Sequence, residues 1–177
     1  MKLRSNKGFS LVELIIVIAI LGIIALIAVP NLTGIQQRSQ VNADLRSAET
    51  IGKAVRIWLT DGAATGRMDT VEGKWVRYDK LSEIEQYVSI DLLPKSYAAT
   101  ASDGGYWVAV VSDSSTYSYH VLVAIGEDST MSLSKDTIEA YTKGGTAGVA
   151  YAEGYTDLAA GITKLKATAE IDAGSVS

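Results

Sequence analysis

The sequence predicts an α+β fold in which a long N-terminal helix, over about residues 9–60, packs its C-terminal half against an antiparallel β-sheet. Three observations predict this fold. Residues 9–29 are almost purely apolar. Apolar residues then recur every three or four positions over 32–59, which is typical of an amphipathic helix. Two β-rich runs follow at 106–111 and 117–125, and glycine- and serine-rich turns flank both of them.

The apolar run at 9–29 has the length of a membrane span. As a helix it would extend about 32 Å, and a bilayer core is roughly 30 Å thick. The residues in front of it include Lys2, Arg4 and Lys7 and no acid. Basic flanks stay in the cytoplasm, so we expect the N-terminus inside and the rest of the chain outside. A removable secretory signal peptide is the alternative, but its apolar core is shorter and ends at a small-residue site that this run lacks.

The segment KGFSLVELIIVIAILGIIALIAVP resembles the N-terminal signature of type IV pilins and of their relatives, the pseudopilins of type II secretion. The resemblance covers roughly the first third of the chain. It implies that a prepilin peptidase cuts between Gly8 and Phe9 and that Phe9 is then N-methylated. It also implies assembly roles for Glu13, for Gly22 within the helix and for Pro30 at the end of the apolar run.

Glu13 is the one charged residue in the apolar run, and a simple anchor would not need it. A carboxylate costs about 2.5–3.5 kcal/mol at the bilayer centre and less near a helix end. Cleavage would expose an amine at Phe9, and a buried carboxylate is tolerated where an opposite charge compensates it. Glu13 lies about 6 Å along the helix axis from that amine. It is within reach of its own amine or, as the family implies, of the amine of an adjacent subunit.

The stretch between Gly22 and Pro30 is the weakest part of the predicted helix. Glycine costs about 1 kcal/mol relative to alanine in a helix interior, and proline about 3 kcal/mol. Pro30 also cannot donate a hydrogen bond to the carbonyl of Leu26. In a bilayer, exposed carbonyls are expensive and keep the segment helical, whereas neighbouring helices in a filament could accept an extended segment. We therefore expect this stretch to extend on assembly.

A helix over 9–59 would extend about 77 Å, which is more than an anchor needs. We expect its first part to pack among copies of itself or in lipid, and its one-sided second part to pack on a domain. The expected organisation is a cleaved leader at 1–8, a transmembrane and filament-core helix at 9–30, an amphipathic helix of the head at 31–60 and a β-rich globular head at 61–177.

Within the head, the sequence predicts several shorter elements besides the hairpin of the two β-rich runs. We expect a loop over 63–73, a short helix over 81–87, a short strand at 131–134 and one helical turn at 138–141. Residues 162–171 fit both a helix and an alternating strand, and the strand is slightly favoured.

Catalytic chemistry is not indicated. His120 is the only histidine and the chain has no cysteine, so a usual zinc set cannot form. We expect His120 to be a strand residue with a local hydrogen bond. The glycine-rich run at 144–148 lacks the lysine and the Ser/Thr of a phosphate loop. Trp107 is expected in the core. The sequence thus predicts no enzyme activity, no cofactor and no metal.

The chain is acidic, with a net charge of −4, and the basic leader makes the remainder more acidic still. Nucleic acid is therefore not an expected partner, because phosphate binding needs clustered Lys and Arg. Many pilins of Gram-negative bacteria carry a disulfide near the C-terminus. This chain has no cysteine, so the resemblance is closer to Gram-positive pilins.

The resemblance implies a structural subunit of a type IV pilus, which leaves the membrane to form an extracellular filament for adhesion, motility or biofilm. Expected partners are further copies in a helical homopolymer, prepilin peptidase and an assembly machinery with an inner platform protein and an ATPase. Before assembly, we expect a single-pass membrane protein with a cytoplasmic N-terminus. A pseudopilin of a type II secretion or DNA-uptake system and a minor adhesive pilin are the alternatives, and an anchored enzyme is a distant fourth.

Overall fold

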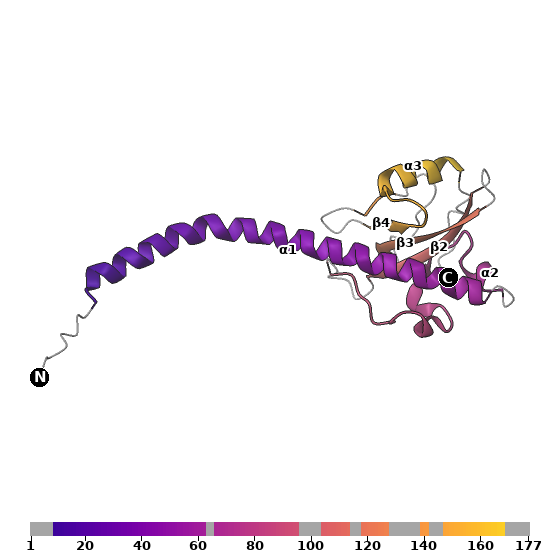
Figure 1. Cartoon of the computed structure of the whole chain (residues 1–177), viewed down its shortest axis with the longest axis horizontal. Coiled ribbons are helices and arrows are strands. Elements are labelled where there is room, and N and C mark those ends of the chain that lie inside the picture. Colours follow the sequence, from indigo (N-terminus) through magenta and orange to yellow (C-terminus); the bar gives the residue numbers. More distant parts are fainter. Residues whose placement is uncertain are drawn as a thin grey trace, which may run out of the picture. The chain divides into compact units, whose positions relative to one another are not determined.

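A computed structural model describes residues 9–62, 66–95, 104–113, 118–127, 139–141 and 147–168. The chain divides into two compact units, Met1–Arg38 and Ser39–Ser177. The elements, in chain order, are the helices α1 (Leu11–Asp61) and α2 (Arg67–Val71), strand β1 (Val76–Arg77), the 3₁₀ turns η2 (Tyr78–Lys80) and η3 (Ile84–Gln86), strands β2 (Gly105–Asp113), β3 (Ser118–Gly126) and β4 (Gly148–Ala152), and helix α3 (Leu158–Thr168) (Figure 1). The predicted N-terminal helix is confirmed.

The N-terminal unit is helical from Leu11 onward, and the helix continues through Pro30. Its large aliphatic side chains are exposed, from 47% at Val17 to 79% at Leu26. They point outward on all sides, so a helix of this composition needs a cover that the single chain does not supply within its described residues. Among those residues, no helix combines the length and hydropathy that crossing a membrane requires.

The second unit is built on a four-stranded antiparallel sheet of order β1-β2-β3-β4. Strands β2 and β3 pair along their whole length, with Val110 opposite Val121. The predicted hairpin is therefore confirmed. Strands β1 and β4, which flank it, are short and were not predicted from the sequence.

One face of the sheet packs on the C-terminal part of α1. Ile51, Val55 and Trp58 of α1 share a buried cluster with Val108 and Val123 of the sheet. The apolar positions of α1 recur three and four residues apart, so they lie on one side of the helix. The prediction that this part of the helix packs on an antiparallel sheet is confirmed.

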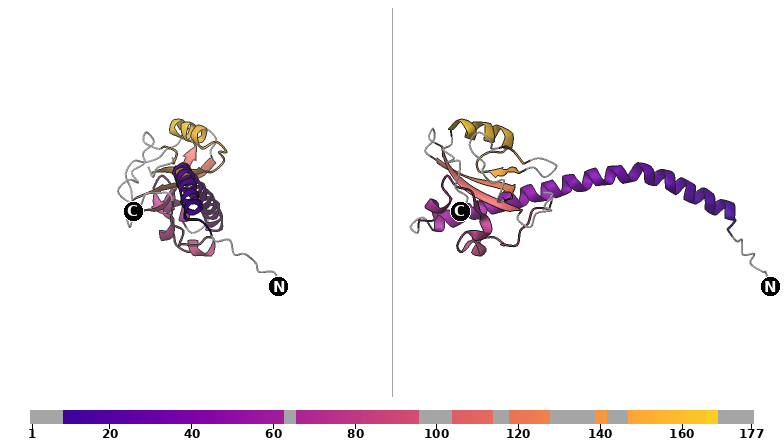
Figure 2. Two further views of the ribbon diagram at one scale, coloured as in Figure 1. Left: turned by 90° about the vertical axis from the view of Figure 1, so that its left-hand side faces the viewer. Right: turned by 180° about the vertical axis from the view of Figure 1, so that it is seen from behind.

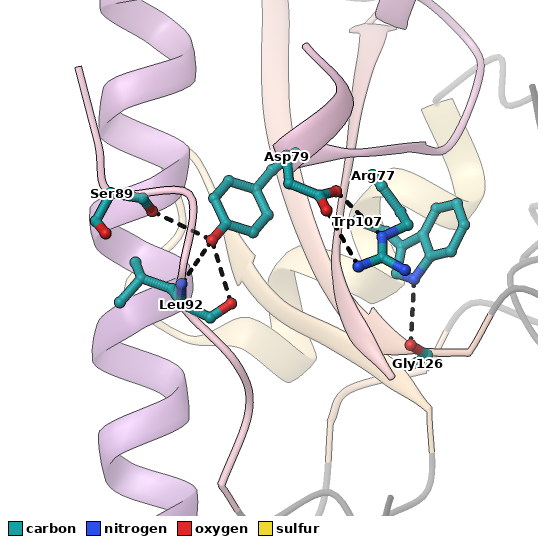
Figure 3. Close-up of polar contacts among 7 residues, drawn as sticks. Arg77, Asp79, Ser89, Leu92, Trp107 and Gly126 are labelled. Carbon is teal, nitrogen blue, oxygen red and sulfur yellow. Dashed lines mark hydrogen bonds and ion pairs between the residues drawn. The ribbon is translucent and has the colours of Figure 1, made fainter. Parts of the chain in front are cut away.

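The other face of the same sheet is also buried, beneath α3. Trp107 and Leu122 on this face share a second cluster with Trp75 and with Ile162 of α3. Figures 1 and 2 show the C-terminal part of α1 and helix α3 on opposite sides of the sheet. The expectation that Trp107 lies in the core is confirmed, and its indole Nε1 donates to the carbonyl of Gly126 at 3.2 Å (Figure 3).

Strand β4 approaches α1 closely at Gly52. A Cβ built on Gly52 would collide with the ring of Tyr151, which is half-buried against the helix. A second close approach occurs at Gly148, where an added Cβ would meet the backbone nitrogen of Tyr141 at 2.8 Å. The missing side chain at Gly52 therefore lets Tyr151 of β4 lie against α1. The missing side chain at Gly148 lets β4 lie against the backbone of Tyr141.

The connection that follows η3 is fastened by two buried side chains. The hydroxyl of Tyr78 accepts from the amide of Leu92 at 2.9 Å and lies 3.2 Å from the carbonyl of Ser89, and Figure 3 shows both residues around it. Burial raises the pKa of Tyr78. The carboxylate of Asp44, which is fully buried on α1, accepts from the amide of Lys95 at 2.7 Å. The segment between Ser89 and Lys95 is thus held at both ends.

Two expectations for the head are wrong because local hydrogen bonds decide the conformation. The expected loop over 63–73 contains helix α2, which begins after Gly66 in the left-handed region, at φ 74°. The favoured strand at 162–171 is instead helix α3 over its described part. Asp157 caps this helix, since its carboxylate accepts from the amides of Ala159 at 3.0 Å and Ala160 at 3.1 Å.

The expected helical turn at 138–141 is also wrong for its described residues. Tyr141 donates from its amide to the carbonyl of Val149 at 2.7 Å, and Ala140 and Val149 form a parallel bridge. This segment is therefore extended beside β4 and covers its edge. In place of the helix expected at 81–87, the structure has only the 3₁₀ turn η3. The strand expected at 131–134 lies outside the described residues.

Candidate functional site

The N-terminus of α1 is closed by a reciprocal pair of hydrogen bonds. The amide of Glu13 donates to the hydroxyl of Ser10 at 3.2 Å, and the amide of Ser10 donates to the carboxylate of Glu13 at 2.8 Å. The carbonyl of Ser10 accepts the first intrahelical bond, from Leu14 at 3.2 Å. This is a capping box, in which Ser10 is the N-cap and Glu13 occupies the third helical position.

The capping box gives Glu13 a partner within its own chain. A carboxylate near a helix N-terminus is also favoured by the helix dipole. Glu13 was expected to pair with a Phe9 amine alone, although the Ser-x-x-Glu spacing that signals a capping box is present at residues 10–13. Phe9 itself lies outside the helix and is 84% exposed.

Of the other predicted site residues, Gly22 has no close neighbour among the described residues. An added Cβ at Gly22 would find no atom within 4 Å, so no described neighbour requires a glycine there. At Pro30 the backbone is helical, and Gly8 lies outside the described residues. The structure therefore brings Ser10 and Glu13 together and leaves Gly22 and Pro30 apart from them.

His120 lies on β3 with local hydrogen bonds, as the sequence predicts. Its Nδ1 is 3.0 Å from the carbonyl of Glu153, and its Nε2 is 3.3 Å from the hydroxyl of Ser118. The Glu153 carboxylate is engaged elsewhere, with the amide of Val121 at 3.1 Å and with Arg56 at 3.4 Å. The carboxylate therefore fastens β3 and α1 to the turn after β4. Within the described residues, no three His, Asp or Glu side chains gather in a way that would hold a metal.

The N-terminal segment also matches known proteins. The prokaryotic N-terminal methylation motif matches residues 3–29. The type IV major pilin protein PilE of Neisseria gonorrhoeae is 37% identical over 85 residues, which are 43% of this chain and 51% of that protein. The N-terminal segment of this chain is therefore similar to that of a type IV pilin.

Two further relatives of the N-terminal segment carry fimbrial names. The fimbrial protein EcpC of Eikenella corrodens is 43% identical over 78 residues, which are 40% of this chain and 51% of that protein. A type IV major fimbrial protein FimA of Dichelobacter nodosus is 40% identical over 61 residues, which are 34% of this chain and 39% of that protein. The chain spans about half the length of the curated relatives it matches, or less. No solved structure matches it.

Proposed function

We propose that this protein is a structural subunit of a type IV pilus. The observation that carries the proposal is the exposed apolar surface of α1 from Leu11 to Ile27, which lies within the matched methylation motif at residues 3–29. Apolar side chains on every side of a helix need a cover of lipid or of other apolar helices. Lipid supplies this cover before assembly, and copies of the same helix supply it in the filament.

The proposed life of the chain has two stages. The precursor is held in the membrane with its N-terminus in the cytoplasm, and prepilin peptidase removes residues 1–8. An inner platform protein and an ATPase then drive the processed chain into an extracellular helical homopolymer. Glu13, Gly22 and Pro30 act in assembly, and the head forms the outer surface. The proposal includes no catalytic step, cofactor or nucleic acid.

The names of two relatives favour a main pilus subunit over a pseudopilin or a minor tip pilin. PilE of N. gonorrhoeae is named a type IV major pilin protein, and FimA of D. nodosus is named a type IV major fimbrial protein. Electron microscopy of material sheared from cells, with mass spectrometry of its main protein band, tests this choice. Long filaments in which this chain is the most abundant protein support the main subunit, and the absence of filaments contradicts it.

The processing step gives a first prediction. We expect the filament form of the chain to begin at N-methylated Phe9, because the basic leader and the apolar run lie on either side of the Gly8–Phe9 bond in the sequence. Intact-mass and N-terminal peptide analysis of sheared filaments measures it. Filaments whose subunits still begin at Met1 would contradict the prediction. A bulky residue in place of Gly8 should block cleavage and serves as the control.

The helix between Gly22 and Pro30 gives a second prediction. It is continuous in the single chain, and we expect part of it to be extended in the filament. Extension gives up to ~3.3 Å per residue against ~1.5 Å in a helix, so eight residues would add on the order of 14 Å. A cryo-electron microscopy map of the filament measures it. Unbroken helical density from Ile23 to Val29 would rule the extension out.

A further inference from the structure

The C-terminal end of α1 is closed by an arginine that stacks on a tryptophan. The guanidinium of Arg67 lies 5.1 Å from the centre of the Trp58 ring, and its Nη1 donates to the carbonyl of Trp58 at 2.8 Å. The indole of Trp58 in turn donates to the carbonyl of Ser82 at 2.7 Å. These contacts fix the guanidinium, whose side chain is only 13% exposed.

Glu83 faces this arginine from a strained backbone position. Its carboxylate pairs with Nη2 of Arg67. The amide of Ile84 donates to the carbonyl of Leu81 at 3.3 Å, which closes a four-residue turn with Glu83 as its third residue. Glu83 has φ 61° and is the one residue other than glycine at positive φ in the described part of the chain. Glycine or asparagine suits this position of a turn, so a glutamate there indicates a use for its side chain.

A cavity of about 290 Å³ opens beside the ion pair. It is lined by Gly66, Arg67, Thr70, Ser82 and Glu83. In the part of the chain that the structure describes, the hydroxyls of Thr70 and Ser82 have no hydrogen-bond partner. A guanidinium has five N–H donors, so Arg67 keeps donors beyond those it gives to Trp58 and Glu83. The Glu83 side chain is 58% exposed and can accept further bonds.

We propose that this cavity binds the vicinal diol of a neutral sugar residue. In a diol, one hydroxyl donates to the carboxylate of Glu83 while the adjacent oxygen accepts from the guanidinium of Arg67, so the ion pair is spanned without being broken. The hydroxyls of Thr70 and Ser82 complete the ring of donors and acceptors. The site goes beyond the proposed filament function, because it concerns what the head recognises.

Charge and size favour a neutral sugar over other ligands. An anion would be repelled by the carboxylate of Glu83 and a cation by the guanidinium of Arg67, whereas a neutral diol is repelled by neither. The cavity lies just below the range of about 300–1,000 Å³ typical of drug-sized ligands, which fits a single sugar residue. With few contacts, we expect a dissociation constant on the order of 1–10 mM.

The test is a titration of the full chain in detergent micelles, followed by amide chemical shifts in NMR spectra. The ligands are methyl α-mannoside and methyl β-galactoside, which both carry adjacent hydroxyls. Tetrahydropyran-2-methanol, which has a ring but no diol, and inorganic phosphate are the controls. We expect saturable shifts at Gly66, Thr70, Ser82 and Glu83 with at least one glycoside, and none with either control. The same titration with an oligosaccharide that ends in the same sugar then shows whether the cavity binds a sugar at the end of a glycan or only the free sugar.

Variants separate binding from folding. Glu83→Gly relieves the positive φ but removes the carboxylate, so we expect about tenfold weaker binding without loss of thermal stability beyond that of the lost ion pair. The double variant Thr70→Val and Ser82→Ala should weaken binding by a similar factor. Glu85→Gln, at an exposed neighbour that does not line the cavity, is the matched control and should bind as the unchanged protein does.

Three results would overturn the sugar site. The first is the absence of shifts with both glycosides up to 100 times the expected dissociation constant. The second is binding that persists unchanged in Glu83→Gly and in the hydroxyl variants. The third is a response to phosphate that equals or exceeds the response to the glycosides. None of them depends on whether the chain forms filaments.

Discussion

Glu13→Val is expected to reduce filament assembly sharply while the chain still enters the membrane. Removing the charge makes the apolar segment more apolar, so insertion is unchanged or improved. In the filament, however, the amine of Phe9 would lose its proposed carboxylate partner. Removing one partner of a buried charge pair costs about 3–5 kcal/mol. That cost recurs at every subunit, so we expect filament yield to fall by at least about a hundredfold.

The experiment uses a strain that makes only the variant chain. Membrane fractions measure insertion, and the mass of sheared filaments measures assembly. A normal yield of filaments from Glu13→Val would contradict the proposed pairing of Glu13 with the Phe9 amine.

The capping box supplies matched controls for the charge. Glutamine also serves as the last residue of a capping box, so Glu13→Gln keeps the box with Ser10 but removes the charge. Ser10→Ala keeps the charge but removes the capping hydroxyl, at a cost of about 0.5–2 kcal/mol of helix stability. We expect Glu13→Gln to assemble poorly and Ser10→Ala to assemble well. The reverse order would mean that helix capping, and not charge, is the assembly requirement.

The elements predicted well from the sequence are those with long periodic patterns. Helix α1 carries an apolar run and then an amphipathic repeat over 51 residues, and no local alternative competes with a signal of that length. The β2–β3 hairpin combines β-branched and aromatic residues with clear turns on both sides. Local sequence and tertiary packing favour the same structure in both cases.

Helix α3, which covers the face of the sheet opposite α1, is also indicated by the sequence. In β2, Trp107, Ala109 and Val111 face one side while Tyr106, Val108 and Val110 face the other, and all six are buried. A strand with apolar residues on both faces is covered on both faces. The unbroken apolar runs of β2 and β3 therefore predict that a further element packs on the face opposite α1. The segment at 162–171, which fits a helix as well as a strand, could supply that element as a helix.

Other features depend on tertiary contacts that no local pattern reveals. Strand β4 is short and begins at Gly148, and a glycine at the start of a short run predicts a turn and not a strand. Glycine is needed at this position because the backbone of Tyr141 lies against it. Arg67 and Glu83 are 16 residues apart and meet because Trp58 orients both segments. The capping box is the opposite case, since Ser10 and Glu13 could be paired from their spacing alone.

Trp58→Ala is expected to cause the largest loss of stability in the head. The side chain is fully buried between α1 and the sheet. Its loss removes the indole donor to Ser82 and the ring on which Arg67 stacks. Truncation of a buried tryptophan costs about 3–5 kcal/mol. Domains are stable by about 5–15 kcal/mol, so this is a large share, and it corresponds to a fall of roughly 10 °C in the unfolding midpoint.

Thermal unfolding of the full chain in detergent, followed by near-ultraviolet circular dichroism, measures this loss. Trp58→Phe is the graded control, because it keeps a six-membered aromatic ring and removes the five-membered ring with its N–H donor, so a smaller loss is expected. Ile57→Ala is the matched control: its side chain is exposed on the same turn of α1, and its truncation should cost little. A Trp58→Ala midpoint within error of Ile57→Ala would contradict the prediction and show that the Trp58 side chain contributes no net stability to the head.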